Sequence, residues 1–161
     1  MIHTNKGLDL PISGAPSLEI DSSTAINSIA LLGPDFVGLK PTMLVKEGET
    51  VAAGQKLFED KKNPGVYITS PSSGVVQSIN RGEKRRFLSL VIEIDNSIEA
   101  QEFYLNSYDS SIKFLIDSGA FSYFKTRPYN RIPSAEAMPD AIFVNACDTN
   151  PLAVDPHHLI K

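Results

Sequence analysis

The sequence has little of what marks secreted, membrane-spanning or nucleic-acid-binding proteins. Its single cysteine, Cys147, excludes an internal disulfide and therefore the disulfide-rich secreted scaffolds. Its most apolar runs, residues 29–32 and 141–147, are far shorter than the roughly 20 residues of a membrane-spanning helix. Basic residues number 15 against 19 acidic ones, and the net charge of −4 argues against nucleic acid as a partner. The first residues lack the basic and apolar regions of a signal peptide, so we expect a cytoplasmic location.

What the sequence does contain is typical of a folded, globular chain. Of its 161 residues, 42% are hydrophobic and 21% are charged, which argues against a disordered or fibrous protein. A chain of this length forms one domain or two small ones.

Residues 1–97 have the pattern of short strands separated by turns. Apolar and polar residues alternate over 88–95, which predicts a strand with one buried face. Residues 67–69 and 75–76 also favour strands, and the turn-forming residues at 71–74 separate them. We therefore expect an all-β region, without a helix of more than two turns in residues 40–95.

A weak internal repeat with an offset of 34 residues runs through this β region. The matching pairs are Val45 and Ile79, Gly48 and Gly82, Glu49 and Glu83, and Leu57 and Val91. Two similar strand–turn–strand halves are what a β-sandwich with two-fold pseudosymmetry requires. In addition, residues 45–57 followed by 70–76 resemble the barrel-sandwich domains of biotinyl and lipoyl carriers.

Carrier domains of that type present a lysine for covalent attachment on the hairpin between the two segments. Lys61 and Lys62 occupy that hairpin here, but Pro64 follows them and the usual flanking residues are absent. We therefore expect two surface lysines, and a covalent carrier is the weaker alternative.

The pattern becomes helical and then extended after residue 97. Ile112, Leu115 and Ile116 have helical spacing, with Ser110 near the start and Gly119 where a C-cap would lie. A further helical turn is expected at 121–124. Three prolines between residues 126 and 139 indicate an extended connector. Residues 98–140 are therefore expected to be a helical and extended connector.

Residues 141–161 are expected to be the start of an α/β domain of Rossmann-like type that this chain leaves incomplete. The apolar run at 141–145 predicts a buried strand of a parallel sheet. Asp155 and Pro156 offer an N-cap and a first helical residue. The fold class is thus α+β: a barrel-sandwich hybrid followed by the start of an α/β domain.

Polar residues directly follow the predicted strand, at the place where open α/β sheets bind ligands. The candidate lining is Asn145, Asp148, Thr149 and Asn150. The alternative is a turn in which the Asn and Asp side chains bond to the local backbone. No phosphate-binding glycine loop occurs in the chain.

No metal site or reactive thiol is expected. Adjacent His157 and His158 would face different directions on a helix, His3 stands alone, and no ligand set completes them. Cys147 has no basic neighbour in the sequence to form a thiolate, so we expect it to be inert.

Residues 81–86 carry four positive charges and one negative charge. Such a segment is suited to contact with anionic lipid or an acidic partner. The alternative is a solvated hairpin tip, which is the commoner use of such a cluster.

Five strings along the chain resemble one family. They are KGLDLPISG (6–14), LFEDKKNPGV (57–66), INRGEKR (79–85), FKTRPY (124–129) and IFVNACDTNPLA (142–153). The family is that of NqrA, one of the subunits of the bacterial sodium-translocating NADH:quinone oxidoreductase. The resemblance covers essentially the whole chain, and it matches the N-terminal part of these longer proteins.

This resemblance implies a peripheral subunit of a complex that couples NADH oxidation and ubiquinone reduction to sodium export. The complex uses NADH, flavins, iron–sulfur groups and ubiquinone. Its other subunits are the implied partners, with ubiquinone as a candidate ligand. The implied location is the cytoplasmic face of the bacterial inner membrane, reached through those subunits.

Related electron-input subunits of the Rnf complex and of complex I bind flavin and nicotinamide nucleotide through a glycine-rich loop. The corresponding residues here, 119–128, contain only one glycine and the bulky Phe121, Tyr123 and Phe124. The relatives' acidic motif after the strand also loses its second acid, at Asn150. We therefore expect a vestigial pocket at Asn145, Asp148, Thr149 and Asn150 and no cofactor in this chain. A flavin-binding electron-input subunit is the alternative.

Overall fold

The computed structural model describes residues 12–20, 23–145, 150 and 152–155. The chain forms two compact units. One unit comprises residues 26–138, and the other combines residues 1–25 with residues 139–161. Helices and strands of the described residues all lie in the first unit. Within the described ranges, no helix is long and apolar enough to cross a bilayer.

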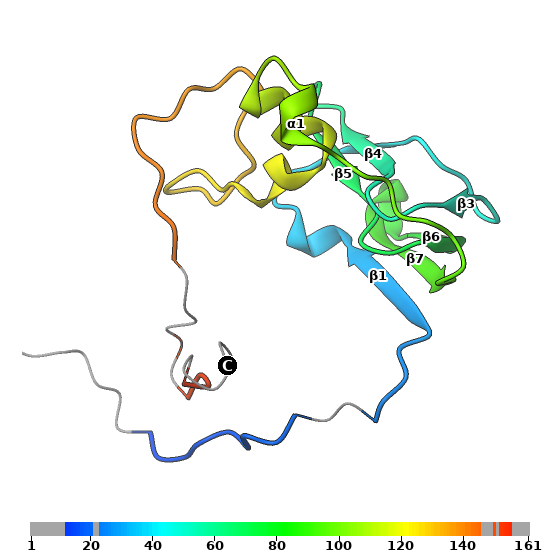
Figure 1. The fold of residues 1–161 in the computed structure, drawn as a ribbon, viewed down its shortest axis with the longest axis vertical. Coiled ribbons are helices and arrows are strands. Elements are labelled where there is room, and N and C mark those ends of the chain that lie inside the picture. Colours follow the sequence, from blue (N-terminus) through cyan, green and yellow to red (C-terminus); the bar gives the residue numbers. More distant parts are fainter. Residues whose placement is uncertain (1–11, 21–22, 146–149, 151, 156–161) are drawn as a thin grey trace, which may run out of the picture. The chain divides into compact units, whose positions relative to one another are not determined.

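The unit formed by residues 26–138 contains two antiparallel sheets (Figure 1). The first sheet has the order β1 (Ser28–Leu32), β7 (Phe87–Ile94), β6 (Gly74–Arg81) and β3 (Thr50–Val51). The second has the order β2 (Pro41–Met43), β4 (Lys56–Asp60) and β5 (Tyr67–Thr69). The prediction of an all-β region without a long helix in residues 40–95 is confirmed.

Apolar side chains from both sheets form one core. Its fully buried members are Val51, Leu57, Phe58, Val76, Leu90 and Ile92. Phe58 is its central aromatic residue, with ring centroids 5.9 Å from Phe36 and 5.3 Å from Phe87. Leu90 and Ile92 lie inside as the alternation in β7 predicts, because successive strand residues point to opposite faces.

The strand pairing follows the internal repeat only in part. The backbone N–H of Leu44 donates to the carbonyl oxygen of Leu57. Adding 34 to both numbers gives Ser78 and Val91, which are paired in the β6–β7 ladder. Beyond the register shift between Val76 and Ser78, the pairs differ by one residue: Met43 pairs with Phe58, whereas Ile92 pairs with Val76 rather than with Gln77.

The helical part of this unit consists of α1 (Ser111–Asp117) and four short 3₁₀ helices. The 3₁₀ helices are η1 (Gly33–Asp35), η2 (Glu83–Arg85), η3 (Leu105–Ser107) and η4 (Ala120–Tyr123). Ser110 is the N-cap of α1, and Gly119 follows its end in the left-handed conformation, both as predicted. Lys56 Nζ on β4 lies 2.6 Å from Asp117 Oδ1, and this ion pair holds α1 beside the second sheet (Figure 1).

The prediction of a buried strand at residues 141–145 is wrong for this structure. These residues have no regular secondary structure, and Phe143 and Val144 are 93% and 86% exposed. A parallel strand gains its hydrogen bonds and its burial from neighbouring strands and covering helices. The described residues supply no such neighbour to this segment. The expected helix start at residues 155–156 lies partly outside the described residues, since only Asp155 is described.

Candidate functional site

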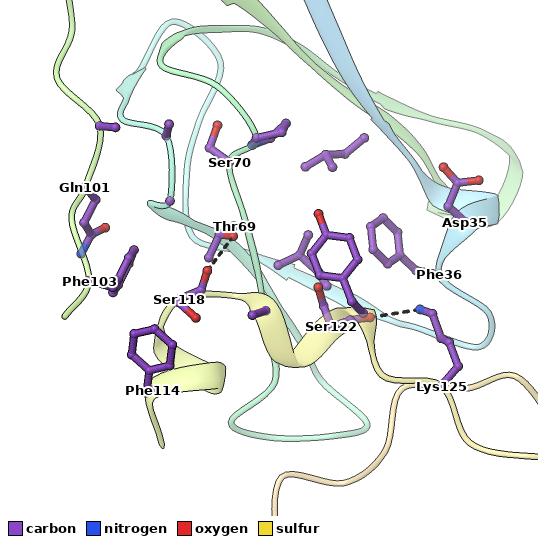
Figure 2. Close-up of a pocket in the computed structure, with 18 residues that line it drawn as sticks. Asp35, Phe36, Thr69, Ser70, Gln101, Phe103, Phe114, Ser118, Ser122 and Lys125 are labelled. Carbon is purple, nitrogen blue, oxygen red and sulfur yellow. Dashed lines mark hydrogen bonds between the residues drawn. The ribbon is translucent and has the colours of Figure 1, made fainter. Parts of the chain in front are cut away.

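A cavity of about 670 Å³ lies within the unit of residues 26–138, between the sheets and the segment that carries α1 and η4 (Figure 2). Its size is within the range of about 300–1,000 Å³ that is usual for small-molecule sites. Its aliphatic and aromatic lining residues are Leu31, Phe36, Ile68, Phe103, Phe114 and Tyr123. Its polar side chains are Asp35, Thr69, Ser70, Gln101, Ser118, Ser122 and Lys125.

The part of the cavity lined by Thr69, Ser118 and Ala120 depends on a close contact between Gly119 and Thr69. A Cβ atom at Gly119 would lie only 2.1 Å from Thr69 Oγ1, and the φ of +79° also favours glycine. Because Gly119 has no side chain, the turn between α1 and η4 approaches β5 directly. Thr69 Oγ1 donates to the carbonyl oxygen of Ser118 at 3.4 Å, as Figure 2 shows.

The aromatic wall of the cavity is held by contacts outside it. Phe114 on α1 makes an edge-on contact with Tyr108, with ring centroids 5.4 Å apart. The backbone N–H of Gln101 donates to the carbonyl oxygen of Ala53 at 2.8 Å. This bond holds the irregular segment that carries Phe103 against the turn before β4.

One end of the cavity is polar and carries charges of both signs. Lys125 Nζ donates to the carbonyl oxygen of Ser122 at 3.1 Å (Figure 2). Ser122 Oγ in turn donates to the carbonyl oxygen of Gly119 at 2.8 Å. Partial desolvation lowers the pKa of Lys125, and the attraction of the Asp35 carboxylate opposes that shift.

This arrangement is suited to binding rather than to covalent chemistry. Aromatic rings line an apolar volume, and hydroxyl and ammonium groups stand at its edge. A flat molecule with polar groups on an apolar ring fits such a lining. Among the described residues, no group of three or more His, Cys, Asp or Glu side chains is placed to hold a metal ion.

The structure does not test the vestigial pocket that the sequence predicts. Asn145 and Asn150 are described and exposed, whereas Asp148 and Thr149 lie outside the described residues. The pocket predicted at these four positions therefore stays a prediction. Cys147 and the three histidines also lie outside the described residues.

The sequence did not reveal the cavity, because its lining comes from segments spread between Leu31 and Lys125. One signal was present. Residues 98–140, expected to be a connector, are rich in aromatic residues, and Phe103, Phe114 and Tyr123 of that segment line the cavity.

The hairpin between β4 and β5 holds the two lysines considered for covalent attachment. Both are exposed, and Lys62 Nζ donates to the carbonyl oxygen of Gly38 at 3.1 Å. The buried carboxylate of Asp60 accepts the backbone N–H groups of Lys40 and Lys62, which fixes the turn. This geometry agrees with surface lysines beside a structured turn.

Two family models match the chain in succession. The NqrA N-terminal barrel-sandwich hybrid domain matches residues 2–95, and the NqrA second alpha/beta domain matches residues 108–161. These matches support the fold class expected from the sequence. The exact domain limits expected at residues 97 and 140 stay a prediction.

Curated relatives match over the whole chain. Those from Actinobacillus pleuropneumoniae serotype 5b, Haemophilus influenzae strain PittGG and Neisseria gonorrhoeae are 47%, 48% and 49% identical to it over 168 aligned positions. Each is named as the A subunit of a Na(+)-translocating NADH-quinone reductase. The alignments cover 100% of this chain but only 37–38% of each relative. The chain belongs to the NqrA family.

Proposed function

We propose that this chain works as part of a peripheral, cofactor-free subunit of a sodium-translocating NADH:quinone oxidoreductase. Such a complex couples NADH oxidation and quinone reduction to sodium export. The observation that carries the proposal is an identity of 47–49% over the entire chain to proteins named as one subunit of that reductase. Their name supports this function and gives no support to the flavin-binding alternative.

The proposed location is the cytoplasmic face of the inner membrane. The electron donor in the relatives' name is NADH, which is formed in the cytoplasm. A subunit of this enzyme is therefore expected to associate with the membrane on that side, through the other subunits. Protease digestion of right-side-out and inside-out vesicles tests this, and cleavage only in inside-out vesicles is expected.

Purification of the complex tests the function. An affinity tag on the full-length protein is expected to bring down a membrane complex whose NADH:quinone reductase activity increases with sodium. Membranes lacking the protein are expected to lose that activity. A tagged protein that purifies alone, from membranes that keep the full activity without it, would contradict the proposal.

The cofactor-free part of the proposal depends on the segment after α1. Gly119 is required for the contact with Thr69, and Phe121 is only 7% exposed because it packs inside the unit. Flavin phosphates need several backbone N–H groups that are free of such packing. Calorimetric titration with flavin mononucleotide and with NADH is expected to give no heat of binding. Micromolar binding of either would overturn this part.

The cavity is the proposed contact for the quinone. A quinone ring is flat and apolar and carries two carbonyl oxygens. The rings of Phe36, Phe103 and Phe114 offer it an aromatic wall. Lys125 offers an ammonium donor for a carbonyl oxygen, since its Nζ makes one bond to Ser122 and has three donors in all.

Replacing Lys125 with Met in the full complex tests this contact. A charged hydrogen bond is worth roughly 1.5–3 kcal/mol, so the KM for a short-chain quinone is expected to rise about tenfold or more. Lys113→Met is the control, because Lys113 is exposed on α1 and does not line the cavity. Equal KM values for the two variants would exclude Lys125 from quinone binding.

A further inference from the structure

The hairpin tip between β6 and β7 is strongly basic, and neither the proposed function nor the cavity uses it. We call residues 81–86 the basic tip. Its cations are Arg81, Lys84, Arg85 and Arg86, and all four are exposed. Within the described part of the chain, none of them forms an ion pair with a carboxylate. With the carboxylate of Glu83, the tip therefore carries a net charge of +3 on a chain whose net charge is −4.

The backbone of the basic tip adopts a conformation that suits other residues better. Lys84 and Arg85 have φ values of 52° and 60°, and the N–H of Arg86 donates to the carbonyl oxygen of Glu83 at 3.1 Å. Positive φ at both central residues is the mark of a type I′ turn, which matches the twist of paired strands. Such turns strongly prefer Asn-Gly, because side chains other than Asn, Asp and Gly are strained there. This chain places a lysine and an arginine at both strained positions.

The basic tip is also held in a fixed shape. The N–H of Gly82 donates to the carbonyl oxygen of Arg86 at 2.8 Å, and Arg81 Nη1 donates to that of Arg85 at 3.4 Å. Phe87, the next residue, is only 6% exposed and anchors the tip to the core. The backbone that carries the four cations is thus fixed by these bonds, and so is the side chain of Arg81.

These features distinguish a protein surface from a lipid surface as the partner. A lipid layer is fluid and binds polybasic segments without any fixed geometry, at roughly 1 kcal/mol per cation. The basic tip contains no apolar side chain that could insert into a bilayer. Three of the four cations are arginines, whose planar guanidinium groups bind carboxylates through two parallel hydrogen bonds.

We propose that the basic tip is a docking surface for a partner protein that carries a cluster of Asp and Glu carboxylates. The strained turn positions Lys84 and Arg85 at the end of the hairpin, and Arg81 and Arg86 flank them. The inference goes beyond the proposed function, because it names an interface by its chemistry and applies to whichever protein carries the acidic cluster.

Carbodiimide cross-linking of native membranes that contain the full-length protein tests this docking. The reagent activates a carboxylate, the Nζ of Lys84 attacks it, and an amide bond forms while the reagent leaves as its urea. We expect a cross-link from Lys84 to an Asp or Glu of a partner, located by mass spectrometry in a surface with at least two further carboxylates. Lys46, exposed in the turn before β3, is the control lysine and is expected not to cross-link.

Two variants distinguish the effect of the positive charge of the basic tip from the effect of the reactive amine of Lys84. Lys84→Arg keeps the charge but has no amine, so the cross-link is lost while the partner stays bound. Arg85→Glu combined with Arg86→Glu keeps the amine of Lys84 but changes the net charge of the tip from +3 to −1, and the cross-link yield is expected to fall at least tenfold. An unchanged yield in that double variant would overturn the proposal.

Flotation with vesicles tests the lipid alternative directly. Vesicles with 30% phosphatidylglycerol and neutral phosphatidylcholine vesicles are each mixed with the purified protein. We expect no difference between them that depends on the tip. Flotation with the anionic vesicles that Arg85→Glu with Arg86→Glu abolishes, together with no cross-link from Lys84 to protein, would make lipid the partner. Because the cross-linked protein is identified, a partner outside the reductase would contradict the proposed function while supporting the docking surface.

Discussion

Strand β7 and residues 141–145 are both rich in apolar residues, yet the first is buried in the core and the second is exposed to solvent. In β7, Leu90 and Ile92 are fully buried between the two sheets. In residues 141–145, Phe143 and Val144 are almost fully exposed and form no strand. The two segments differ in pattern, because β7 alternates apolar and polar residues whereas residues 141–144 are continuously apolar.

The difference shows where each kind of strand obtains its stability. An alternating strand needs a paired neighbour and one covered face, and β7 pairs with both β1 and β6 of the same unit. A continuously apolar strand needs cover on both faces as well as paired edges. Local sequence can specify the first kind of strand within a short stretch of chain, but not the second.

The largest expected contrast is between a core and an exposed phenylalanine. Phe58→Ala removes a fully buried ring that contacts Phe36 and Phe87, and it is expected to cost about 3–5 kcal/mol of unfolding free energy. Phe143→Ala is expected to change it by less than about 0.5 kcal/mol. Urea denaturation measures both. A large loss for Phe143→Ala would show that residues 141–145 are packed in solution.

Alanine substitution at two glycines with similar φ values distinguishes the cost of a steric clash from the cost of backbone strain. Gly119→Ala combines a positive φ with a clash against Thr69, and it is expected to cost about 2–4 kcal/mol. Gly48→Ala has a φ of +81° and open space around its Cβ, so only about 1–2 kcal/mol of strain is expected. Thermal unfolding compares them, and equal losses would mean that the Gly119–Thr69 contact does not restrict the turn.

Substitutions in the basic tip, between β6 and β7, are expected to stabilise the protein. Lys84→Asn combined with Arg85→Gly is expected to increase the unfolding free energy by about 1–2 kcal/mol, because both residues then suit positive φ. The same variant is expected to weaken docking to the acidic partner. Thermal unfolding measures the first effect, and a destabilised double variant would contradict the strain assigned to this turn.

The smallest effect is expected at the ion pair between Lys56 and Asp117. Its side chains are 35% and 29% exposed, so Asp117→Asn is expected to cost about 0.5–1 kcal/mol in low salt. The loss is expected to shrink in about 1 M salt, where charges are screened within roughly 3 Å. Asp109→Asn, at an exposed position ahead of α1, is the control without effect. A loss independent of salt would point to packing rather than charge.

The sequence predicted the fold best where the signals are local. The alternation in β7, the helix start near Ser110 and the glycine expected at the end of that helix all depend on neighbouring residues, and these predictions are confirmed. The repeat with an offset of 34 is matched by the pairing of Ser78 with Val91, but the pairs beyond the register shift at Val76 differ by one residue.

The candidate site could not be predicted from local sequence patterns, because its residues come from distant segments. The cavity joins Phe36 from the end of η1, Thr69 from β5 and Phe114 from α1, and no short motif links these positions. The basic tip, in contrast, was visible in the sequence as a charge cluster. Its strained turn was not, because Lys84 and Arg85 give no sign of positive φ and the twist of β6 and β7 imposes it.

We expect the quinone to bind in the cavity of the unit formed by residues 26–138 and not at the residues around Asn145. Photolabelling of the isolated complex with an azido-quinone, followed by peptide mapping, distinguishes the two sites. We expect labelled peptides from residues 101–125 or 31–36, with labelling suppressed by excess unmodified quinone. Suppressible labelling of residues 141–155, with none at the cavity, would contradict it.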